Sequence, residues 1–167
     1  GIDVEPNGSG AISLLTANTT VKFDGTANTL TQDFNLTNLV LGSSLPALAG
    51  ATLNVGVGFD VLKATTSGSG NVAIGYSSLY QLTTGANNVS IGLSSGQALT
   101  TASKCTLVGV IAGQSITTGV NSNNTAIGYS SLNNLTTGVS NIALGVSSGS
   151  AYTGAETSNI CIGNTGT

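Results

Sequence analysis

The pattern of hydrophobic and polar residues repeats along this chain with a period of 16 to 19 residues. Each copy contains a five-residue word: usually asparagine, a β-branched or aliphatic residue, a small residue, Ile, Leu or Val, and glycine. The words are NLVLG at 38–42, NVGVG at 54–58, NVAIG at 71–75, NVSIG at 88–92, CTLVG at 105–109, NTAIG at 124–128, NIALG at 141–145 and NICIG at 159–163. Such a period is typical of a solenoid in which each copy forms one turn, or rung. The sequence therefore predicts an all-β fold, a parallel β-solenoid (β-roll or β-helix) with about eight rungs of about 17 residues.

The alternation within each word predicts the two faces of a short strand. The residue before the closing glycine is branched and aliphatic in every copy, so we expect this column to form the inner core. Its members are Leu41, Val57, Ile74, Ile91, Val108, Ile127, Leu144 and Ile162. The preceding position is mostly small, as in Ala73 and Ser90, although Val40 and Leu107 are larger. Because small side chains let another backbone approach, we expect the subunit interface on this second face.

Two further columns predict how each rung turns. Glycine supplies the backbone angles that the corners require, and the predicted turn glycines are Gly42, Gly58, Gly75, Gly92, Gly109, Gly128, Gly145 and Gly163. The asparagines would stack at about 4.8 Å and form an amide ladder at a corner. The predicted ladder consists of Asn38, Asn54, Asn71, Asn88, Asn124, Asn141 and Asn159, with Cys105 in the place of one asparagine.

The repeat also indicates two domains. Residues 1–37 lack the repeat, and the alternation around Val21 and Phe23 predicts a short β-rich lead-in or cap. Residues 38–167 form the predicted solenoid domain. The longest repeat has two extra residues in Val120–Asn123, which predicts a protruding loop there.

Composition and charge exclude several classes of partner. Only 5% of the residues are charged, and the three lysines are the only Lys or Arg residues in a chain of net charge −3. A basic stripe for phosphates is therefore missing, so we expect no nucleic acid partner. A run of about 20 apolar residues and a basic amphipathic helix are also missing, so we expect no membrane insertion. The glycines are spaced by rungs and make no phosphate-binding loop, and we expect no cofactor.

Candidate catalytic groups are sparse in the repeat region. Asp60 and Glu156 are about six rungs apart, or roughly 29 Å, which is too far for a pair of catalytic carboxylates. The chain has no histidine, so Cys105 and Cys161 lack an imidazole partner. These two cysteines are three rungs apart, about 14 Å, so we expect free thiols and no disulfide. We expect no catalytic site and no metal site.

Some exposed polar and aromatic residues are candidates for surface binding. Tyr76 and Tyr129 follow closing glycines, where their rings would either stack on sugars or pack at a corner or interface. Asn121, Ser122 and Asn123 belong to the predicted loop. Regular Thr-Thr pairs could order water, as in ice-binding proteins. Because each pair precedes a turn glycine, we favour a role in shaping a corner.

The small number of apolar residues in each rung bears on the assembly. With three or four such side chains a rung, one thin coil buries little apolar surface. Three chains around a common axis would bury a face of every coil and cover the sheet edges. We therefore predict a homotrimer.

The repeat words resemble those of known families. The segment NTAIGYSSLNNLTTGVSNIALG at 124–145 resembles the head repeats of trimeric autotransporter adhesins. It is more similar to the longer repeats of tail-fibre and appendage proteins of phages and large viruses. The resemblance covers residues 54–167, and it implies a trimeric, left-handed parallel β-roll or β-helix that projects from a virion or cell. The longer period and Cys105 depart from the adhesin pattern.

The leading functional hypothesis is a structural fibre or adhesin segment of a viral or phage appendage, without enzymatic activity. It would be a rigid trimeric shaft or head that mediates attachment to a host-surface glycan or receptor, located on the virion or cell surface. The first alternative is a bacterial trimeric surface adhesin. Alternatives of other classes are an ice-binding or extracellular matrix β-solenoid and a glycan-cleaving spike.

Overall fold

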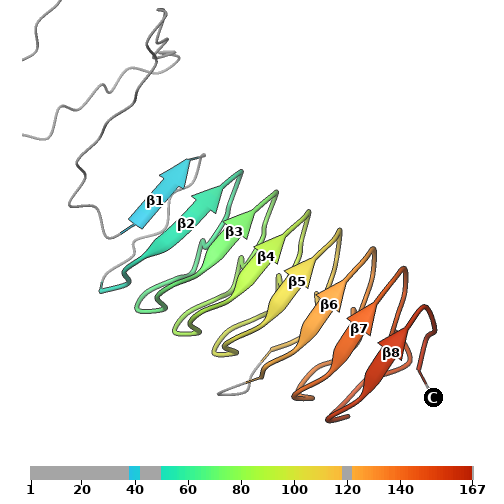
Figure 1. The fold of residues 1–167 in the computed structure, drawn as a ribbon. Coiled ribbons are helices and arrows are strands. Elements are labelled where there is room, and N and C mark those ends of the chain that lie inside the picture. Colours follow the sequence, from blue (N-terminus) through green and yellow to red (C-terminus); the bar gives the residue numbers. More distant parts are fainter. Residues whose placement is uncertain (1–37, 42–49, 118–121, 167) are drawn as a thin grey trace, which may run out of the picture. The chain divides into compact units, whose positions relative to one another are not determined.

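The solenoid region folds into eight short parallel strands in a single sheet (Figure 1). The computed structural model describes residues 38–41, 50–117 and 122–166. The strands are β1 (Asn38–Leu41), β2 (Asn54–Val57), β3 (Val72–Ile74), β4 (Val89–Ile91), β5 (Thr106–Val108), β6 (Thr125–Ile127), β7 (Ile142–Leu144) and β8 (Ile160–Ile162). The predicted all-β parallel β-solenoid is confirmed, and the eight strands delimit about seven turns of about 17 residues. The predicted lead-in at 1–37 lies outside the described residues.

Each strand pairs with the strand of the next repeat, and equivalent positions of the two five-residue words are level with each other. Val72 is level with Val89, and Ile74 is level with Ile91. The Val72 N–H donates to the Asn88 carbonyl at 2.8 Å, and the Gly92 N–H donates to the Ile74 carbonyl at 2.8 Å. The longer repeat between β5 and β6 keeps this register. The pairing therefore joins each rung directly to the next one along the chain.

A glycine ends each strand and turns the chain out of the sheet. In six rungs its φ lies between 118° and 139°, a region that L side chains rarely adopt. Space is also limiting, because a Cβ on Gly75 would lie 2.6 Å from the Gly92 carbonyl oxygen. The predicted turn glycines Gly58, Gly75, Gly92, Gly109, Gly128, Gly145 and Gly163 all have positive φ angles. Gly42 lies outside the described residues.

Two residues with left-handed backbone follow each corner and return the chain beneath the sheet. In the β3 rung they are Ser77, with φ 53°, and Leu79, with φ 50°. The position of Leu79 is taken by glycine in the next two rungs, at Gly96 and Gly113. The left-handed conformation costs a non-glycine residue roughly 1–2 kcal/mol, and burial of the whole Leu79 side chain offsets this cost. Each rung thus has a strand layer and a returning layer.

The core lies between these two layers. Its large side chains come from the returning segments, at the fourth and seventh positions after the closing glycine. They are Leu62, Leu79, Leu82, Leu99, Ile116, Leu132, Leu135 and Tyr152. The strands contribute small buried residues such as Ala73 and Ala126. Leu107 is the large exception, and it fits because Gly96 and Gly113 leave room: a Cβ on Gly113 would lie 2.7 Å from Leu107 Cδ2.

The prediction of which sheet face forms the core was wrong. The expected core column faces outward: Leu41, Val57, Ile74, Ile91, Ile127, Leu144 and Ile162 are 36% to 66% exposed, and Val108 is half-buried. The column of small residues, expected at a subunit interface, is buried within the chain instead. The physical reason is volume. Large side chains from the returning segments, such as Leu79 and Leu82, fill the interior, so mostly small side chains fit beneath the strands.

The asparagines of the predicted ladder are hydrogen-bonded to one another inside the coil. Asn71 donates from its backbone N and from Nδ2 to Asn54 Oδ1, at 2.9 and 3.0 Å. Its Nδ2 also donates to the Gly85 carbonyl at 3.0 Å. Bonds of the same kind link the other asparagines of the ladder, Asn38, Asn54, Asn88, Asn124, Asn141 and Asn159. The ladder ties the start of each strand to the returning segment of its neighbour.

The returning segments carry side-chain hydrogen bonds of their own. The buried Ser78 hydroxyl donates to the Ser90 carbonyl at 2.9 Å, and Ser148 donates to Cys161 in the same way. The Thr83 hydroxyl donates to the Thr100 carbonyl at 3.0 Å. This bond links the first threonine of the pair to the next rung. No helix that is long and apolar enough to cross a membrane occurs in the described part of the chain.

Candidate interaction surface

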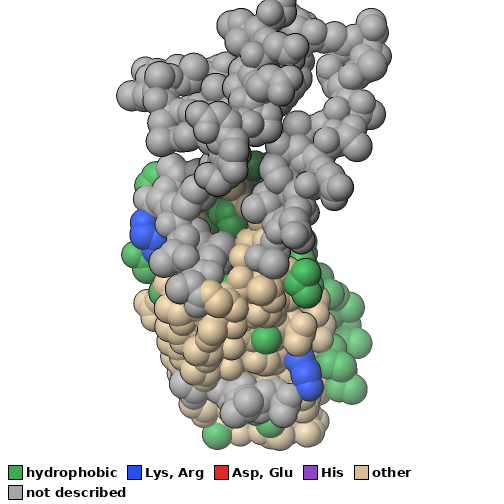
Figure 2. All heavy atoms as spheres, turned by 90° about the vertical axis from the view of Figure 1, so that its left-hand side faces the viewer, with side chains coloured by type: hydrophobic (Ala, Val, Ile, Leu, Met, Phe, Trp, Pro, Cys, Tyr) green, Lys and Arg blue, Asp and Glu red, His purple; other side chains and the backbone are tan. Residues whose placement is uncertain are grey.

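The outer face of the sheet carries an array of apolar side chains that extends over all eight strands. We call this array the apolar stripe: the outward residues of β1–β8, together with the residue that follows each closing glycine. Its hydrophobic members are Leu39, Leu41, Val55, Val57, Phe59, Val72, Ile74, Tyr76, Val89, Ile91, Leu93, Val108, Val110, Ile127, Tyr129, Ile142, Leu144, Val146, Ile160 and Ile162. Of the 17 exposed large hydrophobic side chains in the described residues, 16 belong to it. Figure 2 shows hydrophobic side chains gathered along one margin of the solenoid.

The dimensions of the apolar stripe place it among interaction surfaces. Seven strand-to-strand steps of about 4.8 Å give a length of about 34 Å. With a width of about 13 Å, the stripe covers on the order of 400 Å² in projection, which is the size of the functional patches found on soluble proteins. Its positions hold no charged residue. The four described charged side chains, those of Asp60, Lys63, Lys104 and Glu156, stand at other positions.

The predicted tyrosines lie within the apolar stripe. Tyr76 is 54% exposed and Tyr129 is 55% exposed, which agrees with their predicted place at the surface. The Tyr76 ring stacks on Phe59 of the preceding rung, with ring centroids 5.4 Å apart and an angle of 4° between the planes. Tyr76 is therefore part of a hydrophobic column and is not an isolated aromatic platform.

The predicted loop is only partly within the described residues. Asn121 lies outside them. Asn123 is exposed, with a left-handed φ of 45°. Ser122 is fully buried, so its prediction as a surface-binding residue was wrong. It is drawn inward because its side chain hydrogen-bonds the Cys105 thiol.

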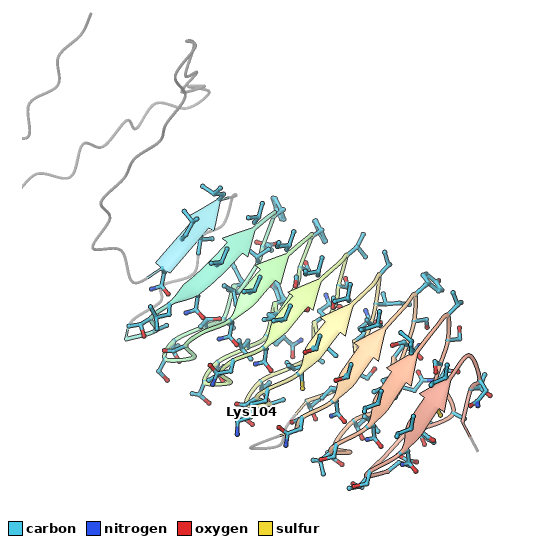
Figure 3. All side chains as sticks on the ribbon, in the orientation of Figure 1. Lys104 is labelled. Carbon is cyan, nitrogen blue, oxygen red and sulfur yellow. The ribbon has the colours of Figure 1, made fainter. Side chains whose placement is uncertain are left out.

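Three of the four charged side chains in the described residues have local structural partners, those of Asp60, Lys63 and Glu156. Lys63 Nζ lies 3.0 Å from Asp60 Oδ1. Glu156 accepts a hydrogen bond from the Gly154 N–H at 2.9 Å, and such backbone donors lower the pKa of this carboxyl group. Lys104 extends from the edge where the strands begin (Figure 3). Within the described ranges, no cluster of three or more His, Cys, Asp or Glu residues is arranged to hold a metal ion.

Both cysteines are free thiols, as expected, and both are buried within the chain. Cys105 is in the place of a ladder asparagine, and its N–H donates to Asn88 Oδ1 at 2.9 Å. Burial raises the pKa of the Cys105 thiol, and hydrogen bonds from the Asn124 N–H and the Ser122 side chain oppose this rise. Cys161 Sγ lies 3.0 Å from the Tyr152 hydroxyl. This hydrogen bond, together with burial, raises the pKa of Tyr152.

The sequence reasoning missed the apolar stripe as a surface. The residues after the closing glycines carried a signal, because all six described ones before β8 are large and apolar or aromatic. They are Phe59, Tyr76, Leu93, Val110, Tyr129 and Val146. A turn position with this composition is unusual unless the side chains are covered by another surface. Comparisons with protein-family models, curated proteins and solved structures gave no match. The fold and the stripe therefore carry the functional argument.

Proposed function

We propose that this chain is a structural, non-enzymatic segment of a homotrimeric fibre or adhesin in a viral or phage appendage. Three copies would join along their apolar stripes and form a rigid shaft or head at the surface of the virion. The repeat words that resemble those of tail-fibre proteins support this assignment. The single observation that carries it is the apolar stripe, because a contiguous exposed apolar surface of this size often marks an interaction site.

The apolar stripe is suited to association with identical copies. A parallel copy places each residue level with its own equivalent, so any charge in the interface would face a like charge. The stripe has no charged position and therefore avoids this repulsion. Burial of apolar area contributes about 25 cal/mol per Å², which makes the exposed isoleucines and valines the main source of affinity.

The hydrogen-bond pattern supports a mechanical role. Strand pairing, the asparagine ladder and the threonine bonds connect each rung to the next at several points around the coil. Opening one rung would break all of these bonds together. Such a coil is a stiff spacer that offers few accessible segments to proteases.

Attachment to a host surface would use the part that the assembly leaves exposed. The returning segments present amides and hydroxyls such as those of Gln81, Thr84 and Asn134. These neutral groups fit an uncharged glycan better than a sulfated one. In this arrangement Tyr76 and Tyr129 pack at the margin of the trimer interface.

The test is the mass of the intact chain in solution, measured by sedimentation equilibrium over a range of concentrations. We expect three times the chain mass of 16.3 kDa. Ile91→Lys places a charge in the centre of the apolar stripe and should weaken association by at least about tenfold. The matched control is Thr101→Lys, because Thr101 is exposed in a returning segment. A monomer at all concentrations, or equal effects of the two substitutions, would contradict the proposal.

A further inference from the structure

Two polar residues interrupt the apolar stripe at its middle. The first outward position of each strand is Leu, Val or Ile in six strands, but it is Thr106 in β5 and Thr125 in β6. These two threonines are level with each other in adjacent strands. They therefore form one polar spot, two rungs high, with Val89 on one side and Ile142 on the other.

The hydroxyls of this polar spot are not used by the fold. The threonines of the returning segments, such as Thr83 and Thr100, donate to backbone carbonyls of the next rung. The hydroxyls of Thr106 and Thr125 make no hydrogen bond within the described part of the chain. Valine has almost the same shape and would suit the apolar stripe better. The fold of a single chain thus gives no reason for a hydroxyl at either position.

We infer that Thr106 and Thr125 set the axial register in which copies of this chain associate. This inference rests on the proposed self-association through the apolar stripe. The remainder of the stripe is aliphatic or aromatic and repeats every 4.8 Å or so, so neighbouring copies could shift by one rung and still bury apolar surface. The polar spot removes this freedom, because it occurs at one height only.

The energetic basis is the cost of burying an unpaired hydroxyl. When parallel copies are in register, the threonines of one copy face those of its neighbours, and their hydroxyls can donate to and accept from each other. A shift of one rung places Thr106 or Thr125 against Val89 or Ile142 of a neighbour. Each buried hydroxyl left without a partner should disfavour that register by about tenfold. A single buried polar position fixes register in coiled coils by the same principle.

The orientation of the copies follows from the three-fold axis, since rotation about an axis keeps all chains parallel. An antiparallel pair with Thr106 opposite Thr125 would also match the polar spot. That pair would bring β4 of one copy level with β7 of the other. Cross-links from residues of the apolar stripe distinguish the two arrangements, because Ile91 would be level with Ile91 only in the parallel one.

The experiment uses the full chain with one cysteine introduced in the apolar stripe. Ile91→Cys and Ile127→Cys chains are mixed, refolded together and oxidised. Their sites in β4 and β6 are two rungs apart, about 9.6 Å along the axis, and a shift of one rung reduces this separation to about 4.8 Å, within reach of a disulfide. The linked peptides are then identified by mass spectrometry. The native Cys105 and Cys161 are 1% and 3% exposed and should not react. We expect links between equivalent sites, 91–91 and 127–127, and at least about tenfold fewer 91–127 links.

The same mixture is then prepared with Thr106→Val and Thr125→Val in both chains. We expect the 91–127 links to rise by about tenfold while the apparent affinity stays equal or increases. Thr106→Ser with Thr125→Ser should restore the original pattern, since serine keeps the hydroxyl. The control Thr84→Val removes an exposed threonine of a returning segment and should leave the pattern unchanged.

The outcomes separate the two proposals. A monomeric mass with no link between chains overturns the proposed function and the register inference together. An oligomer whose link pattern is the same with threonine and valine overturns the register inference alone. Abundant 91–127 links in the chain with native threonines also overturn it. Loss of register in the valine variant and its return with serine support it.

Discussion

At the scale of single residues, the asparagine ladder contributes most to the definition of a rung. One Asn71 side chain accepts from the backbone and the amide of Asn88, and it donates to Asn54 and to the Gly85 carbonyl. Its site is fully buried, so water cannot replace these partners. The cost of losing a buried partner exceeds the net gain from forming the bond. Asparagine is therefore required at this position because its removal would leave buried hydrogen-bonding groups of the neighbouring rungs without partners.

Asn71→Ala tests this requirement. The substitution leaves the Asn88 N–H and the Gly85 carbonyl without a partner, and it removes one of the two donors to Asn54 Oδ1, so the free energy of unfolding should fall by about 2 to 4 kcal/mol. The measurement is denaturation by urea. The free energy of unfolding should depend on urea concentration with the same slope in the variant and in the unmodified protein. Asn134→Ala is the matched control: Asn134 is exposed, and its one bond to the Ser150 carbonyl can be replaced by water. Equal losses for the two variants would contradict a special role of the ladder.

Cys105 gives a prediction for the dependence of stability on pH. Burial raises the pKa of this thiol in the folded protein, while the unfolded thiol ionises near its ordinary value of about 8.5. Above that pH, the unfolded state releases a proton that the folded state keeps, so the free energy of unfolding falls as pH rises, until the pH passes the folded pKa. Tyr152 acts in the same direction at higher pH.

Cys105→Ser should make the stability curve flatter between about pH 8 and pH 10, because serine does not ionise there. The free energy of unfolding is measured by urea denaturation at several pH values for both proteins. The comparison at each pH cancels the contribution of Tyr152, which both proteins share. Parallel curves would show that the thiol keeps its ordinary pKa on folding.

At the scale of the structural element, the corner glycine explains why each strand is so short. After three or four residues the chain reaches a φ near 130° and leaves the sheet. Gly75→Ala would impose a strained backbone and bring a Cβ to 2.6 Å from the Gly92 carbonyl oxygen, a contact with backbone that cannot move aside. We expect a loss of about 3 kcal/mol or more in the free energy of unfolding.

The control for this prediction is Gly154→Ala. Gly154 has no positive φ, and its Cβ would have only Glu156 Oε2 within 4 Å, at 3.9 Å. Gly154→Ala should change the free energy of unfolding by no more than about 0.5 kcal/mol. Thermal or urea denaturation of both variants measures the difference. A mild effect of Gly75→Ala would mean that the corner adjusts to a side chain.

The element scale also shows how far the sequence determines the fold. The word and its period predict the strands, the corner glycines and the asparagine ladder, since these follow from local backbone chemistry. The inward face was predicted wrongly, because alternation tells which residues share a face but not which face is covered. That depends on the volume supplied by Leu79 and Leu82 from the returning segment. One signal was available: the position of Leu79 is glycine at Gly96 and Gly113, which indicates a left-handed turn directed beneath the sheet.

At the scale of the whole molecule, the described solenoid is a one-dimensional array in which each rung contacts its neighbours in sequence. One long face of this array is apolar, and the opposite layer is covered by hydroxyls and amides. A chain with 5% charged residues has little charge with which to repel other copies. The association of copies should therefore depend on apolar burial, with charge contributing little.

The dependence of association on salt tests this view. Screening at high ionic strength weakens contacts between exposed charges, whereas salts that are excluded from protein surfaces strengthen apolar burial. The association constant from sedimentation should therefore change less than about threefold between 0.05 M and 1 M sodium chloride, and sodium sulfate should raise it. The variant Ile91→Lys is the internal control: three like charges would then meet at one height, so added salt should strengthen its association by screening their repulsion. A steep fall of the association constant with added salt in the unmodified chain would mean that the contact involves Lys63 or Lys104 and not the apolar stripe.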